Sequence, residues 1–418
     1  MSRKETYFPA FPGHPRPFIS IGLPFAEACR QHVTNTFKSK RVYIIVSKSI
    51  SQTSTFAVLR DELGDAVVGV RFGIKQHVPW QDVLEVANDL RRLSADLIVT
   101  LGAGSLTDGA KVASFAFANS AFTLEDMAKL HIGADPKPDL ESLQACRLPI
   151  INIPTSLSGG EYTPRGGATD FRTHQKASFQ HPSIGASLVI LDPAITVSTP
   201  ERVWLSSGIR AVDHCIEGLC SIFFDGPADE ATKETAEDAF TDGLRLILPN
   251  LLRAKHKPED LSARRNCMLG VIGAAKGLKA GVPMGASHGI GHQLGPLGVS
   301  HGETSCVLLP SVLRYNHRHG TASARERQAK VLHILQDLGL DLLKRTDETP
   351  EASNLGDAME AIVSGLGLPT TLDEVGVGNE KFKELADNSM KDRYIPTNPV
   401  TITHPDQVLE ILQMAARP

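Results

Sequence analysis

Three histidines are the residues whose type and spacing in this sequence best suit chemistry. His288 and His292 are four residues apart, so a helix would carry both imidazoles on one face. His301 follows after a short bend containing glycine and proline, which can fold back to that face. This set predicts a metal site or a proton-transfer site, but histidines hydrogen-bonded in a buried core would show the same spacing.

An upstream segment, expected to be helical over residues 204–221, adds further candidates. Arg210 and His214 are four residues apart, and Glu217 follows one turn later. A site that joins His214 to the later histidines would therefore draw on separate segments of the chain. Each histidine alone is more typical of a structural or surface position.

A glycine turn after an apolar run indicates a phosphate-binding element. Residues 97–101 are expected to form a buried strand, and residues 109–119 a helix. A strand, a glycine turn and a helix N-terminus can hold a pyrophosphate, because backbone N–H groups and the helix dipole favour the anion. Thr107 departs from the full dinucleotide-binding fingerprint, so the turn alone is a weak signal. The residues assigned to cofactor binding here are Gly102, Ala103, Gly104, Ser105 and Asp108.

A second loop, from Pro154 to Thr163, is rich in hydroxyl groups that suit ribose and phosphate oxygens. It follows an expected strand over residues 150–153. A polar turn without a ligand would have the same composition. The residues assigned to cofactor binding in and beyond this loop are Thr155, Ser156, Ser158, Lys176 and Leu191.

The order of expected elements indicates an α/β domain followed by an all-helical domain. Apolar runs alternate with amphipathic helical patterns in the first half, which predicts a parallel sheet covered by helices. After residue 200 long helical patterns replace the strands. We place the boundary so that residues 1–196 form a Rossmann-like dinucleotide-binding domain and residues 197–418 a helical domain. The expected strands are 42–46, 66–72, 97–101, 150–153 and 188–191.

Composition narrows the partners and the compartment. The formal net charge of −4 gives no argument for binding nucleic acid or an anionic membrane. No stretch approaches the length of a membrane span, and the N-terminus lacks the apolar run of a secretory signal. The six cysteines contain no Cys-x-x-Cys pair, which favours a reducing, cytoplasmic setting.

Taken together, these motifs resemble the iron-containing alcohol dehydrogenase superfamily, which includes the dehydroquinate synthases. The resemblance implies a dehydroquinate synthase-like fold, a homodimer, and an active site in the cleft between the two domains. It also implies a small-molecule substrate and NADH or NADPH as cofactor. The matching segments, in order, are Gly102–Lys111, Pro154–Thr163, Gly208–Glu217, and His288 with His292 and His301.

One departure from the family pattern is chemically important. The family's metal site uses one aspartate and three histidines, and Arg210 occupies the place of the aspartate. A guanidinium cannot ligate a cation, and Asp213 would point about 100° away from His214 on a helix. We therefore expect that a bound metal is unlikely; if one binds, the expected ligands are His214, His288 and His301.

The maleylacetate reductases, a branch thought to act without metal, resemble this sequence most. Their short Pro-Thr loop and a histidine–proline element near the cofactor are similar, and His77 matches that element. The resemblance implies reduction of an activated, carboxylate-bearing substrate by NADPH or NADH. Arg210 and Lys279 would bind the anion, or Arg210 would instead pair with Asp213 or Glu217 on its own helix. The residues assigned to catalysis are His288, His292, Arg210, His214, His301 and Lys279.

Three other functions stay open at this stage. One is a metal-dependent alcohol or aldehyde dehydrogenase, the second a lyase of the dehydroquinate synthase type, and the third a binding protein that kept the fold. Cofactor choice depends on the end of the strand over residues 42–46. An acidic residue at that position would favour NADH, because it would bind the ribose diol. This sequence has Ser47 and Lys48 there instead.

Overall fold

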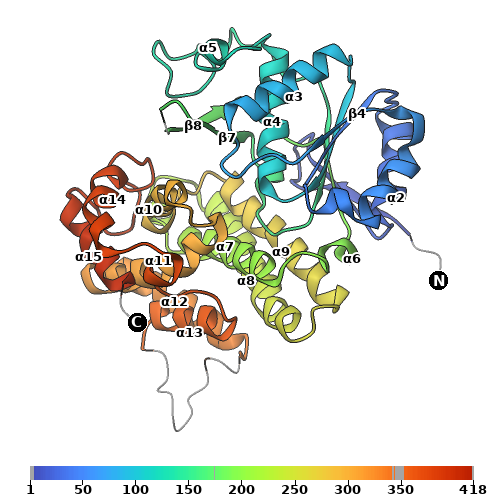
Figure 1. Cartoon of the computed structure of the whole chain (residues 1–418). Helices are drawn as coiled ribbons and strands as arrows, with labels where there is room; N and C mark the ends of the chain where they lie inside the picture. The colour runs from blue at the N-terminus through green and yellow to red at the C-terminus, as the bar shows by residue number, and fades with distance from the viewer. Residues whose placement is uncertain (1–3, 174, 341–342, 344–352, 417–418) are drawn as a thin grey trace. The chain divides into compact units, whose positions relative to one another are not determined.

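The computed structural model describes residues 4–173, 175–340, 343 and 353–416. The chain divides into two compact units, Met1–Ser198 and Thr199–Pro418. Among the described residues, the strands all lie in the first unit, and the second is built from helices (Figure 1). This confirms the predicted order of an α/β domain followed by an all-helical domain.

A seven-stranded sheet organises the first unit, in the order β1-β2-β9-β6-β5-β3-β4. Neighbouring strands from β2 to β4 run parallel, and β1 is antiparallel to β2. The strands are β1 (Thr6–Pro9), β2 (Phe18–Ile21), β3 (Val42–Val46), β4 (Val67–Phe72), β5 (Leu97–Gly102), β6 (Ile150–Pro154) and β9 (Leu188–Leu191). The register brings the carboxyl ends of β3, β5 and β6 side by side, which is where such sheets bind ligands.

Helices cover both faces of this sheet. Alternate residues of β3 point to opposite faces, so Tyr43 and Ile45 join one apolar core while Ile44 joins the other. Figure 1 shows α3 and α4 on one side of β4 and α2 on the other. The helices of this unit are α1 (Phe25–Gln31), α2 (Ser54–Leu63), α3 (Trp80–Arg92), α4 (Gly104–Ala118), α5 (Leu124–Met127) and α6 (Pro193–Thr196).

The structure differs from the sequence prediction in three places in this unit. Helix α4 begins at Gly104 rather than at residue 109, because the glycine turn itself winds into the first helical turn. Strands β1 and β2, of four residues each, were not predicted. A separate antiparallel hairpin, β7 (Arg165–Asp170) with β8 (Gln175–Gln180), was also missed.

Helix α7 lies at the centre of the second unit, where 15 of its 19 residues are buried. It packs against α8, α9 and α11, so its side chains meet neighbours in several directions. A large apolar core joins α10, α11 and α15. The helices are α7 (Glu201–Leu219), α8 (Glu230–His256), α9 (Leu261–Lys279), α10 (Ala286–Leu294), α11 (His301–His319), α12 (Ala322–Asp337), α13 (Leu355–Gly365), α14 (Phe382–Ser389) and α15 (Pro405–Ala415).

Membrane-spanning helices were not expected. Within the described parts of the chain, none of the helices combines the length and the apolar character that a bilayer crossing requires.

Candidate functional site

The glycine turn of the first unit forms an open helix N-terminus. Gly102 ends β5 with a φ of +151°, and a Cβ there would lie 2.6 Å from the Leu106 side chain. Helix α4 then starts at Gly104, and its N-cap residue, Ala103, has no side-chain oxygen to accept from the first N–H groups. Such N–H groups favour an anion. The predicted order of strand, glycine turn and helix N-terminus is present.

Residues from two other strand ends surround this turn. Ser47 follows β3, and its backbone N–H donates to the carbonyl of Leu101 over 3.1 Å. Thr155 follows β6 and donates its N–H to the Gly102 carbonyl over 3.0 Å. A Cβ on Gly104 would lie 3.2 Å from the Ser158 side chain. Hydroxyl-bearing residues from β3 and β6 therefore flank the helix N-terminus, as the sequence suggested.

Of the other residues assigned to the cofactor, the three serines have hydroxyl groups that a ligand could contact, whereas the side chain of Leu191 is buried. Ser156 and Ser158 share a hydroxyl hydrogen bond of 2.8 Å, and Ser105 lies half-buried in the first turn of α4. Leu191 ends β9 and is 1% exposed, so its side chain belongs to the core. Only its backbone is left to contact a ligand.

Lys111, which sequence reasoning did not single out, holds this region together. It is 0% exposed, and its Nζ lies 2.8 Å from Asp108 Oδ1 and 2.7 Å from the Gly160 carbonyl. It also donates to the carbonyl of Arg165. Asp108 in turn accepts the N–H of Gly167 over 3.2 Å. A lysine in the otherwise uncharged residues 109–118 of α4 was the available signal.

His77 and Lys176 are close neighbours in the same unit. His77 and Val78 both have positive φ angles, +64° and +53°, and the Thr169 hydroxyl holds the His77 carbonyl over 2.7 Å. Burial and the nearby Lys176 ammonium lower the pKa of His77. The side chains of Lys176 and Asp108 both lie close to Gly167. His77, Lys176 and Asp108 therefore belong to one polar region.

In the second unit, Glu217 connects α7 to the histidine helix α10. Its carboxylate accepts the backbone N–H of Gly285 over 2.9 Å and that of Ser287 over 2.8 Å. It also lies 2.7 Å from Nδ1 of His288. A charged side chain from α7 thus caps the start of α10 and fixes the orientation of one imidazole.

His288 presents a buried nitrogen that has no partner among the described residues. It is 3% exposed, and with Nδ1 donating to Glu217 its Nε2 is the unprotonated nitrogen. Burial and the Arg210 charge hold the pKa of His288 well below its usual value, so the ring is neutral. The ring of His214, whose pKa burial also lowers, lies 4.6 Å away between centroids.

Asp213 completes a buried polar group with these residues. Its Oδ2 accepts from the hydroxyls of Ser287 over 2.8 Å and Ser305 over 2.5 Å, while Oδ1 is buried without a partner in the described chain. Burial and the neighbouring Glu217 raise the pKa of Asp213. Ligand atoms of Asp213, Glu217 and His288 all lie within 4.8 Å of one another, which makes this group a candidate metal site.

This group differs from the ligand set expected from the sequence, which was His214, His288 and His301. His301 is the first residue of α11 and is exposed, so it lies outside the buried group, which instead includes Asp213 and Glu217. Asp213 was judged a poor ligand because it points away from His214. Other helices pack around α7 on several sides. The side chains of Asp213 and His214 can therefore both lie near His288, although they point about 100° apart. The expectation that a metal is unlikely is not supported.

The remaining residues assigned to catalysis lie in different surroundings. Arg210 is 2% exposed, and its Nη1 lies 3.9 Å from Asp213 Oδ2, a contact that the sequence allowed. His292 is partly exposed and lies with Nδ1 2.8 Å from the Asp392 carboxylate. Lys279 is exposed at the end of α9 and is not part of the buried group.

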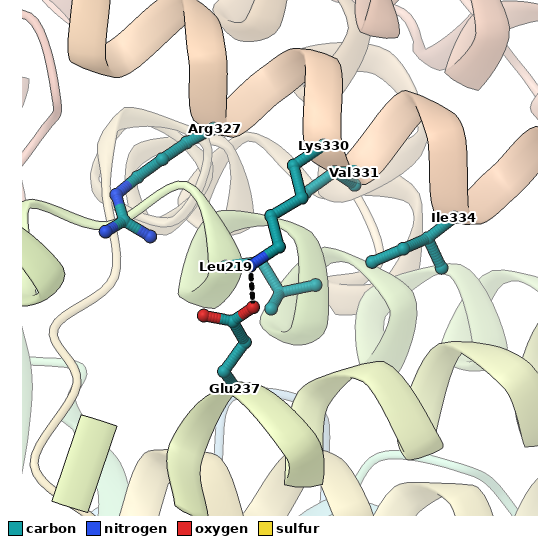
Figure 2. Close-up of a pocket in the computed structure, with 6 residues that line it drawn as sticks. All are labelled: Leu219, Glu237, Arg327, Lys330, Val331 and Ile334. Atoms are coloured by element: carbon teal, nitrogen blue, oxygen red, sulfur yellow. Dashed lines mark hydrogen bonds and ion pairs between the residues drawn. The ribbon is translucent and has the colours of Figure 1, made fainter. Parts of the chain in front are cut away.

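A small cavity elsewhere in the second unit does not serve as a substrate site. Its volume is about 10 Å³, enough for about one water molecule. Figure 2 shows Lys330 paired with Glu237 beside it. The lining residues are Leu219, Glu237, Arg327, Lys330, Val331 and Ile334.

Both units match models of one protein family. Residues 24–193 match the model described as iron-containing alcohol dehydrogenase, and residues 204–416 match the C-terminal model of the Fe-containing alcohol dehydrogenase family. A solved structure, NADH-dependent butanol dehydrogenase A of Thermotoga maritima, has a TM-score of 0.76 at 21% identity. It covers 98% of this chain and is itself covered to 100%, which shows the shared fold.

Curated relatives agree with these matches. Dehydrogenase ALT3 of Alternaria alternata is 42% identical over 390 residues, covering 91% of this chain and 100% of that protein. Dehydrogenase FUM7 of Gibberella moniliformis is 39% identical over 420 residues, 96% of each chain. The maleylacetate reductase of Burkholderia cepacia is more distant, at 31% over 341 residues, covering 81% of this chain and 80% of that protein. The chain therefore belongs to the iron-containing alcohol dehydrogenase family and is an NAD(P)-dependent oxidoreductase.

Proposed function

We propose that this protein is a metal-dependent dehydrogenase that interconverts an alcohol and its aldehyde or ketone with NAD(P)(H). The observation that carries the proposal is the buried group of Asp213, Glu217 and His288, whose ligand atoms all lie within 4.8 Å of one another. Asp213 Oδ1 in this group is buried without a partner among the described residues, whereas buried polar atoms are normally satisfied. Two buried carboxylates beside an imidazole are a set of ligands that calls for a cation.

The donor set fits iron or zinc. Carboxylate oxygens and a neutral imidazole are ligands that these ions accept. Asp213, Glu217 and His288 would hold the ion, and the nitrogen of His288 that faces the two carboxylates is Nδ1, 2.7 Å from Glu217 and 3.6 Å from Asp213. When bound, such an ion polarises a carbonyl oxygen as a Lewis acid and stabilises the charge that develops there.

The residues of the chain supply binding and orientation. Hydride transfer is the chemistry of the cofactor, so the protein must position the nicotinamide and exclude competing reactions. The N-terminus of α4 and the loop beside Ser158 support binding of the pyrophosphate. His292, beside Asp392, is available to exchange a proton with solvent because it is partly exposed.

A second candidate is metal-free reduction of a carboxylate-bearing substrate, and the Burkholderia cepacia relative is named a maleylacetate reductase. Arg210 favours it, because a buried guanidinium stands where the family pattern carries an acidic ligand. Its fixed charge would replace the cation in stabilising negative charge. His288 or His292 would then deliver the proton.

Metal analysis separates the two candidates. We expect the purified protein to contain about one equivalent of iron or zinc per chain by mass spectrometry, in line with one ligand group. A chelator should remove the metal and the NAD(P)-linked alcohol and aldehyde turnover together, and adding the metal back should restore both. Metal-free protein that reduces maleylacetate at full rate would support the second candidate instead.

Cofactor preference follows from the end of β3. We expect the kcat/KM for NADPH to equal or exceed that for NADH, because Ser47 does not repel a 2′-phosphate and Lys48 can attract one. The Lys48→Glu variant should lose activity with NADPH and keep most of its activity with NADH. Initial rates with both cofactors measure this, and a tenfold preference of the unmodified protein for NADH would contradict it.

We further propose, on the family resemblance, a homodimer that acts on a small molecule in the cytoplasm and binds neither nucleic acid nor membrane. The six cysteines support a reducing compartment, since all are free thiols. Light scattering on the purified protein tests the dimer.

A further inference from the structure

Arg210 is a buried cation with defined contacts to two helices. It lies on α7 one turn before His214, and its Nη1 donates to the hydroxyls of Ser305 over 3.0 Å and Thr304 over 3.3 Å. On the side of α10, Gly291 is a neighbour, since a Cβ there would be in ordinary contact with Nη1 at 3.6 Å. Nη1 is therefore fixed to α11, whereas Nε of the same guanidinium is buried without a partner among the described residues.

This held charge faces the same carboxylate that we assign to the metal. Nη1 lies 3.9 Å from Asp213 Oδ2, and Ser305 joins the two by donating to that oxygen over 2.5 Å. Asp213 is 0% and Glu217 6% exposed, so solvent screens the interaction little. An arginine stays protonated in proteins, so the group contains one permanent positive charge before any metal arrives.

We propose, on the basis of the metal-dependent function above, that the charge of Arg210 lowers the affinity of Asp213, Glu217 and His288 for a divalent metal ion. A divalent ion at this group must share Asp213 with the guanidinium and be repelled by it at short range. In a buried site such repulsion is strong. Arg210 is in this sense an affinity-determining residue rather than a ligand.

A purely structural role for Arg210 makes a different prediction. If the side chain only fills space and supports α11 through its hydroxyl contacts, its charge would have no effect on metal affinity. The two roles separate when the charge is removed and the hydrogen-bonding ability is kept, as in Arg210→Gln.

The experiment compares metal affinity in the full-length protein and three variants. Metal-stripped protein is titrated with Co²⁺, followed by its visible d–d absorption, and with Zn²⁺ against a chelator of known affinity. Arg210→Gln should bind both ions at least tenfold more tightly than the unmodified protein. Arg210→Lys keeps the charge and should stay within threefold. Ser305→Ala, which breaks the bridge and keeps the charge, should also stay within threefold.

The outcomes distinguish this inference from the proposed function. If the unmodified protein binds metal and Arg210→Gln binds no more tightly, the inference is wrong and the metal-dependent function stands. If only Arg210→Gln binds metal, the inference is right and the proposed function is wrong. If neither binds, both are wrong. Should Arg210→Gln fail to fold by circular dichroism, Arg210→Met takes its place under the same criteria.

Discussion

Replacing His288 with asparagine is expected to lower turnover at least 1,000-fold, about 4 kcal/mol of transition-state stabilisation. The asparagine amide can still donate to Glu217 from roughly the position of Nδ1, so the start of α10 keeps its contact. The variant loses the imidazole ring, including Nε2, which is buried and without a partner among the described residues. Under either candidate function the imidazole acts directly, as a metal ligand or in proton transfer.

Steady-state kinetics measure this effect, and metal content and thermal stability are recorded on the same samples. His317→Asn is the matched control, because His317 is exposed on α11 in the same unit. It should leave kcat unchanged. A folded His288→Asn variant that keeps more than a tenth of the turnover would show that the buried group is structural.

Replacing Gly104 with valine is expected to raise the dissociation constant for NADPH and NADH at least 100-fold. The new Cβ would lie 3.2 Å from the Ser158 side chain, and the two methyl groups beyond it have no room without moving the loop. They would also cover the N–H groups that open towards the pyrophosphate at the start of α4. The loss should appear in binding before any effect on chemistry.

Fluorescence titration of the cofactor measures the change. Gly104→Ala adds only the Cβ and should give an intermediate loss, while Gly133→Val alters an exposed glycine of the same unit and should give none. Nearly unchanged cofactor affinity in a folded Gly104→Val variant would mean that this turn does not hold the pyrophosphate.

The sequence by itself determined the layered first unit and its glycine turn. Both depend on local chemistry: β3 and β5 are short apolar runs that only a covered parallel sheet buries, and Gly102 adopts a backbone angle that other residues avoid. The register of β5 with β6, which only the structure shows, brings Gly102 beside Pro154.

Tertiary structure alone decided the composition of the polar group in the second unit. Glu217 and His288 are 71 residues apart in sequence, and Asp213 and Ser305 are 92 apart, so their contacts depend on how α7, α10 and α11 pack. The spacing of Asp213 and His214 along one helix predicted that their side chains point in different directions. It did not predict which residues of other helices each side chain would meet. Because α7 is enclosed, Asp213 joined the buried group, whereas His301, at the exposed first turn of α11, did not.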